Sequence, residues 1–199
     1  MNLILALGVL TFFVSTIYFL LKPKPELNTP FIVSFVTLIS YLIMLEGNFL
    51  VGSPETGIYW TRWIGYALSC PLLMYTIAKK LNYNINQIII NMFLTTMVML
   101  TGAWAGLSTS EYKWMFFGLS TFAFSLLIAP ILKSESKNRS QILPYIIIGW
   151  CGFPLIFLLS YESFELIKNN LTLPIYLGLD IFTKIVFYAH QSKLTKTKD

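Results

Sequence analysis

The stretch "PIYLGLDIFTKIVFYAH", residues 174–190, is almost wholly apolar but contains Asp180 and Lys184, four residues apart. Four residues make about one turn of an α-helix, so the two side chains lie on one face within contact distance. An ionisable group inside a membrane span costs about 2.5–3.5 kcal/mol on insertion scales and marks a functional site by default. The pair therefore indicates either a structural ion pair or a chemically modified lysine whose counter-ion is the aspartate.

The rest of the chain is similarly apolar. Of its 199 residues, 56% are hydrophobic and 12% are charged, against about 25% charged in an average soluble domain. Apolar stretches of about 20 residues, enough to cross a bilayer, recur between charged or turn-forming residues. They cover residues 2–21, 29–50, 60–79, 87–106, 113–132, 142–161 and 172–191. The sequence predicts an all-α membrane protein, with a single bundle of seven transmembrane helices over residues 1–199.

The basic residues predict how this bundle is oriented. If successive helices alternate in direction, one side carries Lys22, Lys24, Lys79, Lys80, Lys133, Lys137, Arg139, Lys193, Lys196 and Lys198. The other side carries only Lys113 and Lys168. Short cytoplasmic loops accumulate Lys and Arg, so we expect the N-terminus outside and the C-terminus in the cytoplasm of a cell-membrane protein. Anionic lipid headgroups then account for the net charge of +5, and no nucleic-acid partner is needed.

The remaining polar residues are too few for a metal site. One histidine, His190, and two scattered cysteines, Cys70 and Cys151, have no metal-ligand spacing. Both cysteines are expected to be buried thiols. Glu46 is expected to be a hydrogen-bonded residue between helices. At the outer end of the sixth segment, Glu162 is expected to be a solvated loop charge, as is its neighbour at position 165.

Two further segments favour the modified lysine over the plain ion pair. The third, "YWTRWIGYALSCPLLMYTIAKK" (59–80), carries Arg62 near its start and Pro71 at its centre. The sixth contains "WCGFPLIF" (150–157), with a proline and three aromatic residues. A proline inside a span leaves a backbone carbonyl that neighbouring groups must satisfy. Two proline-bent aromatic helices facing a helix with a buried Asp and Lys are typical of a binding pocket.

With these motifs the chain resembles the microbial (type 1) rhodopsins over all seven segments. The resemblance is carried by "LDIFTK" (179–184), "R..GYALSCPLL" (62–73), "W..FP..F" (150–157) and "YLIML.G" (41–47). It implies a light-driven ion transporter or photoreceptor and no enzyme. It also implies all-trans retinal bound covalently to Lys184 as a protonated Schiff base, with Asp180 as counter-ion.

The resemblance implies the site residues as well. The expected retinal contacts are Lys184, Tyr66, Ser69, Cys70, Leu73, Gly102, Phe117, Ser120, Thr121, Phe124, Trp150, Phe153, Pro154, Phe157, Asp180 and Thr183. The positions expected to take part in proton transfer are Lys184, Asp180, Arg62, Ser69, Cys70 and Thr76. Tyr41 is expected to donate a hydrogen bond to Asp180, and Arg62 to screen that carboxylate from outside.

Two positions set the chain apart from outward proton pumps, which carry carboxylates where this chain has Gly65 and Thr76. Asp180 is then the only counter-ion. "SCP" (69–71) resembles the schizorhodopsins, which are short inward proton pumps, although these have an aromatic residue in place of Gly65 and a glutamate in place of Thr76. We expect a light-driven inward proton pump. The alternatives are a light-gated ion channel, with Cys70 at the position of a channel cysteine, and a photosensory rhodopsin.

Chloride pumping is disfavoured, because "SCP" is not the third-segment pattern of chloride pumps. Family resemblance further implies a homo-oligomer, usually a trimer. The small residues of "GAWAG" (102–106) would allow close approach between helices.

Overall fold

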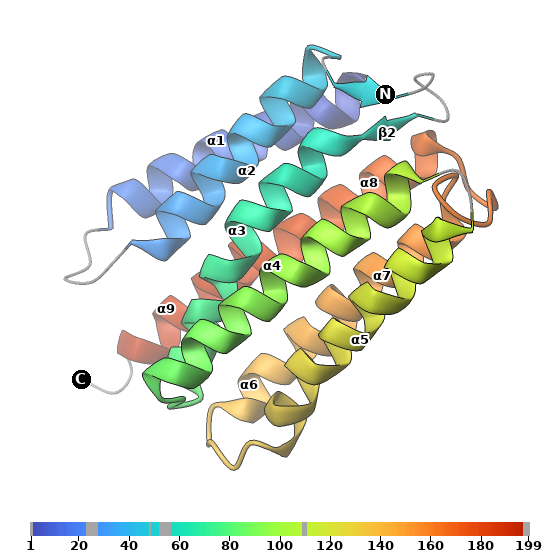
Figure 1. Ribbon diagram of the computed structural model, residues 1–199. Helices are drawn as coiled ribbons and strands as arrows, with labels where there is room; N and C mark the ends of the chain where they lie inside the picture. Colours follow the sequence, from blue (N-terminus) through green and yellow to red (C-terminus); the bar gives the residue numbers. More distant parts are fainter. Residues whose placement is uncertain (1, 23–27, 48, 52–56, 109–110, 197–199) are drawn as a thin grey trace.

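The computed structural model describes residues 2–22, 28–47, 49–51, 57–108 and 111–196. Its helices form a bundle of seven antiparallel passes (Figure 1). Five passes are α1 (Asn2–Leu20), α2 (Thr29–Leu45), α3 (Trp60–Lys80), α4 (Ile85–Leu107) and α5 (Tyr112–Lys133). The sixth pass is α6 (Arg139–Pro144), the π-helical segment η1 (Tyr145–Trp150) and α7 (Cys151–Leu159). The seventh is α8 (Asn169–Asp180), the π-helical η2 (Ile181–Val186) and α9 (Phe187–Lys196).

The predicted seven-helix bundle is confirmed, with changes at the helix ends. By length and composition, five helices of the described chain can cross a membrane: Leu3–Leu20, Ile85–Leu107, Tyr112–Lys133, Arg139–Leu159 and Asn170–Ser192. The second pass is shorter than predicted, because α2 ends at Leu45 and a short hairpin follows, in which β1 (Leu50–Val51) pairs antiparallel with β2 (Ile58–Tyr59). Glu46 is therefore the exposed C-cap residue of α2, and its expected hydrogen bond between helices stays a prediction.

Polar residues define where the helices start. The side chain of Asn28 accepts a hydrogen bond from Phe31 N at the start of α2. Asn84 and Gln87 form a reciprocal capping box at the start of α4. Such caps satisfy backbone N–H groups that have no partner inside the helix. The starts of α2 and α4 lie at the same end of the bundle, where α9 also ends (Figure 1).

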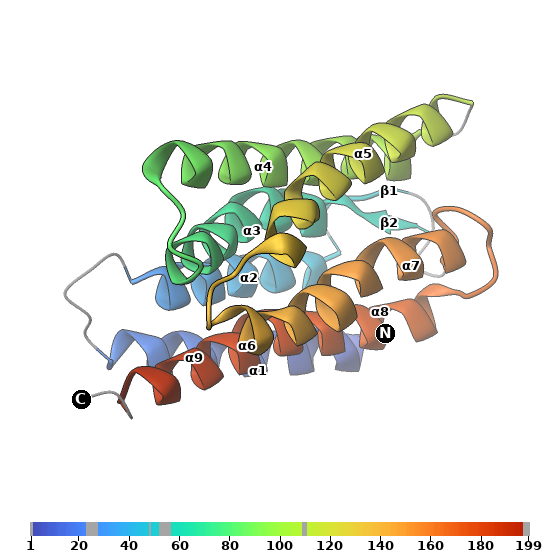
Figure 2. The same cartoon turned by 90° about the horizontal axis from the view of Figure 1, so that it is seen from below.

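The passes are arranged as a ring. Each of the first five helices packs against the next, α7 packs against α8, and α8 packs against α1. Figure 2 shows α4 and α5 on one side of the bundle and α8 and α9 beside α1 on the other. Two apolar clusters fill the interior. One surrounds Leu73, Ile146 and Phe187 near the end with the capped turns, and the other surrounds Phe12 and Leu177 near the hairpin.

Two expectations about surface residues are wrong. Gly102, Ala105 and Gly106 of "GAWAG" are buried within the bundle, because α4 turns them toward other helices of the same chain. They are not available for close packing with a second copy. Cys151 is a free thiol but is exposed on the outside of the bundle, whereas Cys70 is free and buried as expected.

Candidate functional site

The centre of the site is the ion pair that opened the sequence analysis. Lys184 Nζ lies 2.8 Å from Asp180 Oδ1. Asp180 is 0% exposed and Lys184 is 1% exposed. Removing both charges from water is costly unless each keeps a partner and the remaining lone pairs are hydrogen-bonded. The pair therefore needs further donors around the carboxylate.

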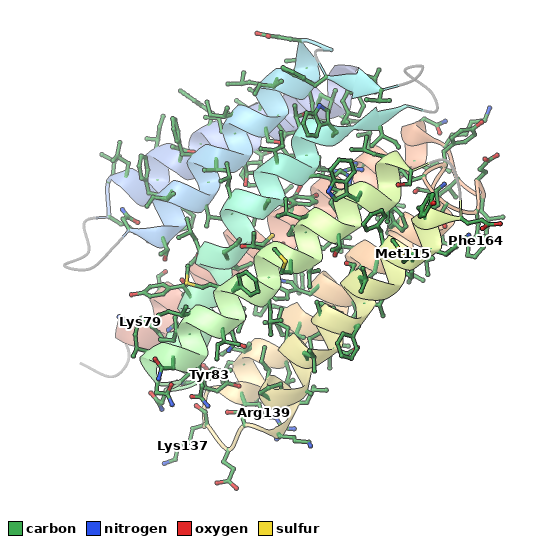
Figure 3. The ribbon with its side chains drawn as sticks, viewed as in Figure 1. Lys79, Tyr83, Met115, Lys137, Arg139 and Phe164 are labelled. Atoms are coloured by element: carbon green, nitrogen blue, oxygen red, sulfur yellow. The ribbon has the colours of Figure 1, made fainter. Side chains whose placement is uncertain are left out.

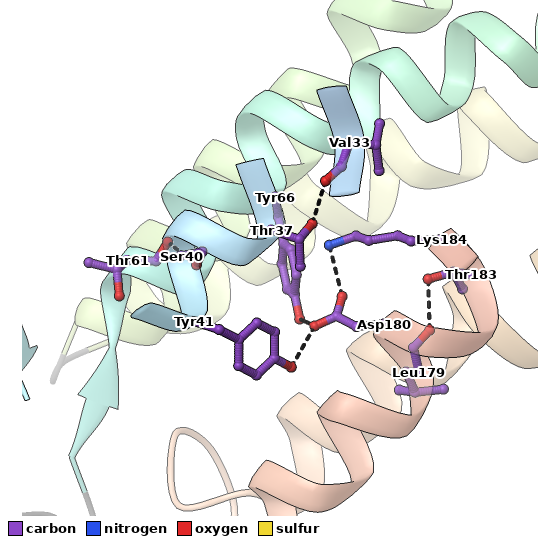
Figure 4. Close-up of polar contacts among 10 residues, drawn as sticks. All are labelled: Val33, Thr37, Ser40, Tyr41, Thr61, Tyr66, Leu179, Asp180, Thr183 and Lys184. Atoms are coloured by element: carbon purple, nitrogen blue, oxygen red, sulfur yellow. Dashed lines mark hydrogen bonds and ion pairs between the residues drawn. The ribbon is translucent and has the colours of Figure 1, made fainter. Parts of the chain in front are cut away.

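Two tyrosines supply these donors (Figure 4). Tyr41 on α2 donates to Asp180 Oδ2 at 3.0 Å, as the sequence predicts. Tyr66 on α3 donates to the same oxygen at 3.2 Å. The Tyr66 ring also lies against the amine, with Lys184 Nζ 4.5 Å from the ring centroid. Three helices thus hold one carboxylate, and its charge is stabilised by the amine and by two hydroxyl groups.

The backbone around Lys184 departs from a regular α-helix. Thr183 and Lys184 lie in η2, and Thr183 Oγ1 donates to Leu179 O at 2.7 Å, which fixes the side chain of Thr183 against its own helix. Opposite it lies Gly149 of η1, where a Cβ atom would come 2.3 Å from Thr183 Cγ2. The sixth and seventh passes therefore approach closely where both are π-helical, a geometry that frequently occurs at functional sites.

This close approach gives a testable prediction. Gly149→Ala should lower stability by about 1–3 kcal/mol, because the new methyl group overlaps Thr183 in a packed interior. Thr183→Ser in the same chain removes Cγ2, keeps the hydroxyl group, and should restore most of the loss. Gly118→Ala is the matched control, since nothing lies within 4 Å of a Cβ there. Thermal unfolding of the four proteins in one detergent measures this, and equal midpoints for Gly149→Ala and Gly118→Ala would contradict the packing argument.

Next to the ion pair is a cavity of about 410 Å³. This volume falls within the range of about 300–1,000 Å³ that is usual for small-molecule pockets. Fourteen of the sixteen residues expected to contact retinal line it: Lys184, Tyr66, Cys70, Leu73, Gly102, Phe117, Ser120, Thr121, Phe124, Trp150, Phe153, Pro154, Phe157 and Thr183. The other two, Ser69 and Asp180, do not line the cavity. Asp180 lies behind the amine in a small void shared with Tyr41, Gly65 and Thr37.

Ser69 is buried at 0% exposure, whereas its neighbour Cys70 lines the cavity wall. Successive residues on a helix point about 100° apart, and here the rotation of α3 turns Cys70 and not Ser69 toward the pocket. The motif "SCP" identified the right turn of α3 without deciding which side chain faces inward.

Aromatic contacts shape the cavity. Phe117 on α5 stacks on Phe157 of α7, with ring centroids 5.4 Å apart. Phe157 also makes an edge contact with Trp63, at 6.2 Å. Trp63 fills the space opposite Gly102, where a Cβ atom would lie 2.8 Å from the indole ring. Aromatic rings from α3, α5 and α7 therefore pack against one another around the pocket, and Gly102, which has no side chain, leaves room for the Trp63 ring.

Several lining residues were not predicted from the sequence. They are Trp63, Val98, Met99, Leu155, Leu158 and Tyr176, together with Arg62, which was predicted for proton transfer and not for the pocket. Helical spacing was an available signal for two of them. Val98 lies four residues before Gly102, and Tyr176 lies four residues before Asp180, so each shares a face with a predicted residue.

Arg62 has a different partner from the one expected. Its Nη2 atom donates to Glu162 Oε1 at 2.6 Å, and its guanidinium group lies 3.9 Å from the centroid of the Tyr176 ring. Arg62 and Glu162 are 4% and 7% exposed. The expectation that Glu162 is a solvated loop charge is therefore wrong. The loop after α7 folds back, with Ser160 Oγ accepting from Glu162 N at 3.2 Å, and carries the carboxylate into the bundle.

Thr76 lies away from the cavity on the last turns of α3. Its hydroxyl oxygen is 3.0 Å from Thr29 Oγ1 and 3.3 Å from the hydroxyl oxygen of Tyr188. Of the six positions expected to take part in proton transfer, the structure thus brings Lys184, Asp180 and Cys70 together. Arg62 lies at one end of the cavity, and Thr76 lies in a separate polar cluster. Within the described residues, no group of three or more His, Cys, Asp or Glu side chains could hold a metal ion.

Comparison with known proteins identifies the class to which this fold and site belong. The family model described as "Bacteriorhodopsin-like protein" matches residues 1–190. The chain therefore belongs to the microbial, bacteriorhodopsin-like rhodopsins, which are multi-pass membrane proteins and act as light-driven transporters or photoreceptors, not as enzymes. Family membership implies a retinal chromophore.

Individual relatives are similar at different levels. The crystal structure of schizorhodopsin 4 superposes with a TM-score of 0.89 at 37% identity, over 96% of this chain and 97% of that one. A cyanorhodopsin from Calothrix sp. NIES-2098 superposes with a TM-score of 0.85 at 18% identity, over 94% of this chain and 90% of that one. This similarity shows the fold alone.

The curated relatives are more distant. A halorhodopsin of Halobacterium sp. (strain SG1) is 26% identical over 75% of this chain and 56% of its own length. Sensory rhodopsin-2 of Natronomonas pharaonis is 25% identical over 78% of this chain and 70% of its own length. The chain spans a little over half the length of the halorhodopsins that it matches.

Proposed function

We propose that this chain is a light-driven inward proton pump, with retinal attached through Lys184 and Asp180 as its single counter-ion. One observation supports the direction. In the described part of the chain, Asp180 is the carboxylate in contact with the Lys184 amine, and Gly65 stands where an outward pump has a second one. A Cβ atom at Gly65 would lie 2.9 Å from Ser40 Cβ, so the place of that second carboxylate is occupied by α2.

The residues present suit the chromophore. The cavity is long enough to be lined by residues from α3, α4, α5 and the sixth and seventh passes, is mostly apolar, and has the Lys184 amine in its wall. Such a slot suits a polyene linked through a lysine. Retinal supplies a light-driven isomerisation that moves the Lys184 nitrogen relative to its surroundings. Asp180 balances the positive charge of that nitrogen, and Tyr41 and Tyr66 hold the carboxylate in place.

The same residues account for an inward route. Lys184 and two tyrosine hydroxyl groups already stabilise the ionised form of Asp180, so it is a poor acceptor for the proton of the Lys184 nitrogen. Beyond it, on the outward side of the pocket, Arg62 is paired with Glu162 and packed on Tyr176, and this ion pair is buried. A proton bound by this pair would neutralise Glu162 and leave the buried Arg62 charge uncompensated, so release toward the other side is favoured.

The membrane orientation is part of this proposal. Lys22, Lys79, Lys80, Lys133 and Arg139 lie at helix ends on one side of the bundle. Figure 3 shows Lys79, Lys137 and Arg139 at this end, and Met115 and Phe164 at the opposite end. By the positive-inside rule the basic end faces the cytoplasm, and the N-terminus is outside. Of the other charges used in the prediction, Lys24 and Lys198 lie outside the described residues.

Light-induced pH changes test the function. In vesicles carrying the retinal-loaded protein in its cellular orientation, illumination should raise the external pH, and a protonophore should abolish the change. Replacing chloride by sulfate should leave the signal unchanged. A chloride importer would instead give proton uptake that the protonophore increases, because protons then follow the electrical potential passively.

Two other outcomes would contradict the pump. Flux that only follows an imposed gradient would identify a light-gated channel. Absence of any flux from a coloured protein would favour a photosensor.

We also propose a trimer, and this proposal rests on family resemblance alone. The small residues of "GAWAG" do not support it, because they are buried inside the bundle. Mass measurement of the protein in lipid nanodiscs or a mild detergent tests it, and a monomer would contradict it.

A further inference from the structure

Three hydroxyl groups, two of them buried and the third half-buried, form a cluster on the cytoplasmic side of the proposed orientation. Thr76 Oγ1 on α3 lies 3.0 Å from Thr29 Oγ1 on α2 and 3.3 Å from the hydroxyl oxygen of Tyr188 on α9. Tyr188 is hydrogen-bonded to Thr29 as well. Thr29 is 5% exposed and Tyr188 is 2% exposed. We call Thr29, Thr76 and Tyr188 the hydroxyl cluster.

The hydroxyl cluster lies between Lys184 and the basic end of the bundle. Tyr188 is four residues beyond Lys184, a rise of about 6 Å along the helix axis. Thr76 is four residues before the end of α3 at Lys80, and Thr29 is the first residue of α2. The three side chains therefore extend from about one helical turn beyond Lys184 to the start of α2, at the end of the bundle.

The section between Lys184 and the hydroxyl cluster is mostly apolar. Leu73, Ile146 and Phe187 are buried there at 1%, 0% and 0% exposure. Cys70 lies at the Lys184 end of this section, on the cavity wall. This apolar section separates the two polar sites, so a proton crosses it only when water enters.

A hydroxyl group can both donate and accept, so a chain of them can pass a proton along. Each oxygen accepts a proton on a lone pair and gives its own proton to the next oxygen, and every group ends in the protonation state in which it started. Aliphatic side chains of the same shape cannot do this. The hydroxyl cluster can therefore relay a proton without holding it.

We propose that the hydroxyl cluster is the cytoplasmic release path for the pumped proton, an inference that rests on the proposed inward pump. The proton leaves the Lys184 nitrogen, crosses the apolar section on water, and passes from Tyr188, directly or through Thr29, to Thr76. Thr76, the half-buried member of the cluster, delivers it to water on the cytoplasmic side. No bond other than O–H and N–H changes, and nothing is oxidised or reduced.

The test is a single-turnover measurement of proton release on the cytoplasmic side, with a pH-sensitive dye and flash excitation of the retinal-loaded protein. Thr76→Val and Tyr188→Phe should each slow proton release about tenfold, because each removes one hydroxyl group from the path and so raises the barrier to proton transfer. Thr76→Ser keeps the hydroxyl group and should stay within about twofold of the native rate. Thr16→Val is the matched control, because Thr16 is a buried hydroxyl that bonds only its own helix, at Phe12 O, among the contacts described.

A second measurement needs no chromophore. In retinal-free protein with ¹³C-labelled tyrosine, the NMR signal of the Tyr188 ring should shift in Thr76→Val and not in Thr16→Val. An unmoved signal, or release from Thr76→Val within about twofold of native, would overturn the relay and leave the pump intact. A native protein that releases no proton to the cytoplasm would instead overturn the proposed function.

Discussion

Replacing Lys184 and Asp180 together, as Lys184→Met with Asp180→Asn, is expected to give a folded protein that stays colourless when all-trans retinal is added. The amine is the group that would bind the aldehyde, and methionine has none. The native protein and the control Lys133→Met, at an exposed lysine that ends α5, should both form a pigment. Absorption spectra after retinal addition measure this.

The double replacement separates the chemical role of Lys184 from its structural role. Lys184→Met alone leaves Asp180 buried without its cation, which costs about 3–5 kcal/mol in comparable buried pairs. A colourless single variant could then simply be unfolded. Asp180→Asn in the same chain removes the uncompensated charge and keeps an oxygen for Tyr41 and Tyr66, so most of the stability should return.

The two explanations of the Asp180 and Lys184 pair then give opposite results. A purely structural pair predicts that the native protein is as colourless as the double variant. A retinal linkage predicts colour in the native protein and none in the double variant, at similar melting temperatures. Pigment formation by the double variant would show that retinal attaches elsewhere and would remove the basis of the proposed function.

The parts of the site that were predictable from the sequence are those that depend on local spacing. Asp180 and Lys184 are one helical turn apart, so their contact follows from the helix itself and appears in the structure at 2.8 Å. The lengths of the apolar segments likewise gave the seven passes. Tyr66 and Gly102 were expected to border one space because of the resemblance to the microbial rhodopsins, and both line the cavity.

The parts that were not predictable depend on how a loop folds or on one-residue shifts. Glu162 follows α7 in a polar loop, and no local pattern indicates that this loop turns back to Arg62. Ser69 and Cys70 differ by one position, and the helix rotation that selects Cys70 is set by packing. The π-helical turns η1 and η2 are similar cases, because the close approach of Gly149 to Thr183 is a tertiary contact.

Asp180→Asn alone is expected to change colour and transport together, since the same carboxylate stabilises the positive charge on the Lys184 nitrogen in both. Without it the cation loses a buried partner at 2.8 Å, a loss of about 3–5 kcal/mol in comparable pairs. The neutral form of the nitrogen is then favoured, so visible absorption should fall or shift strongly and light-driven alkalinisation should disappear.

Tyr41→Phe and Tyr66→Phe are the matched controls, because each removes one donor to Asp180 Oδ2 but keeps the charge. Each loss is worth about 1–3 kcal/mol, so their spectra should shift less than that of Asp180→Asn and transport should persist. The order of the three shifts is the critical result. If either phenylalanine variant changed the spectrum as much as Asp180→Asn, the hydrogen-bonded tyrosines and not the carboxylate charge would set the colour, and Asp180 would no longer be the counter-ion.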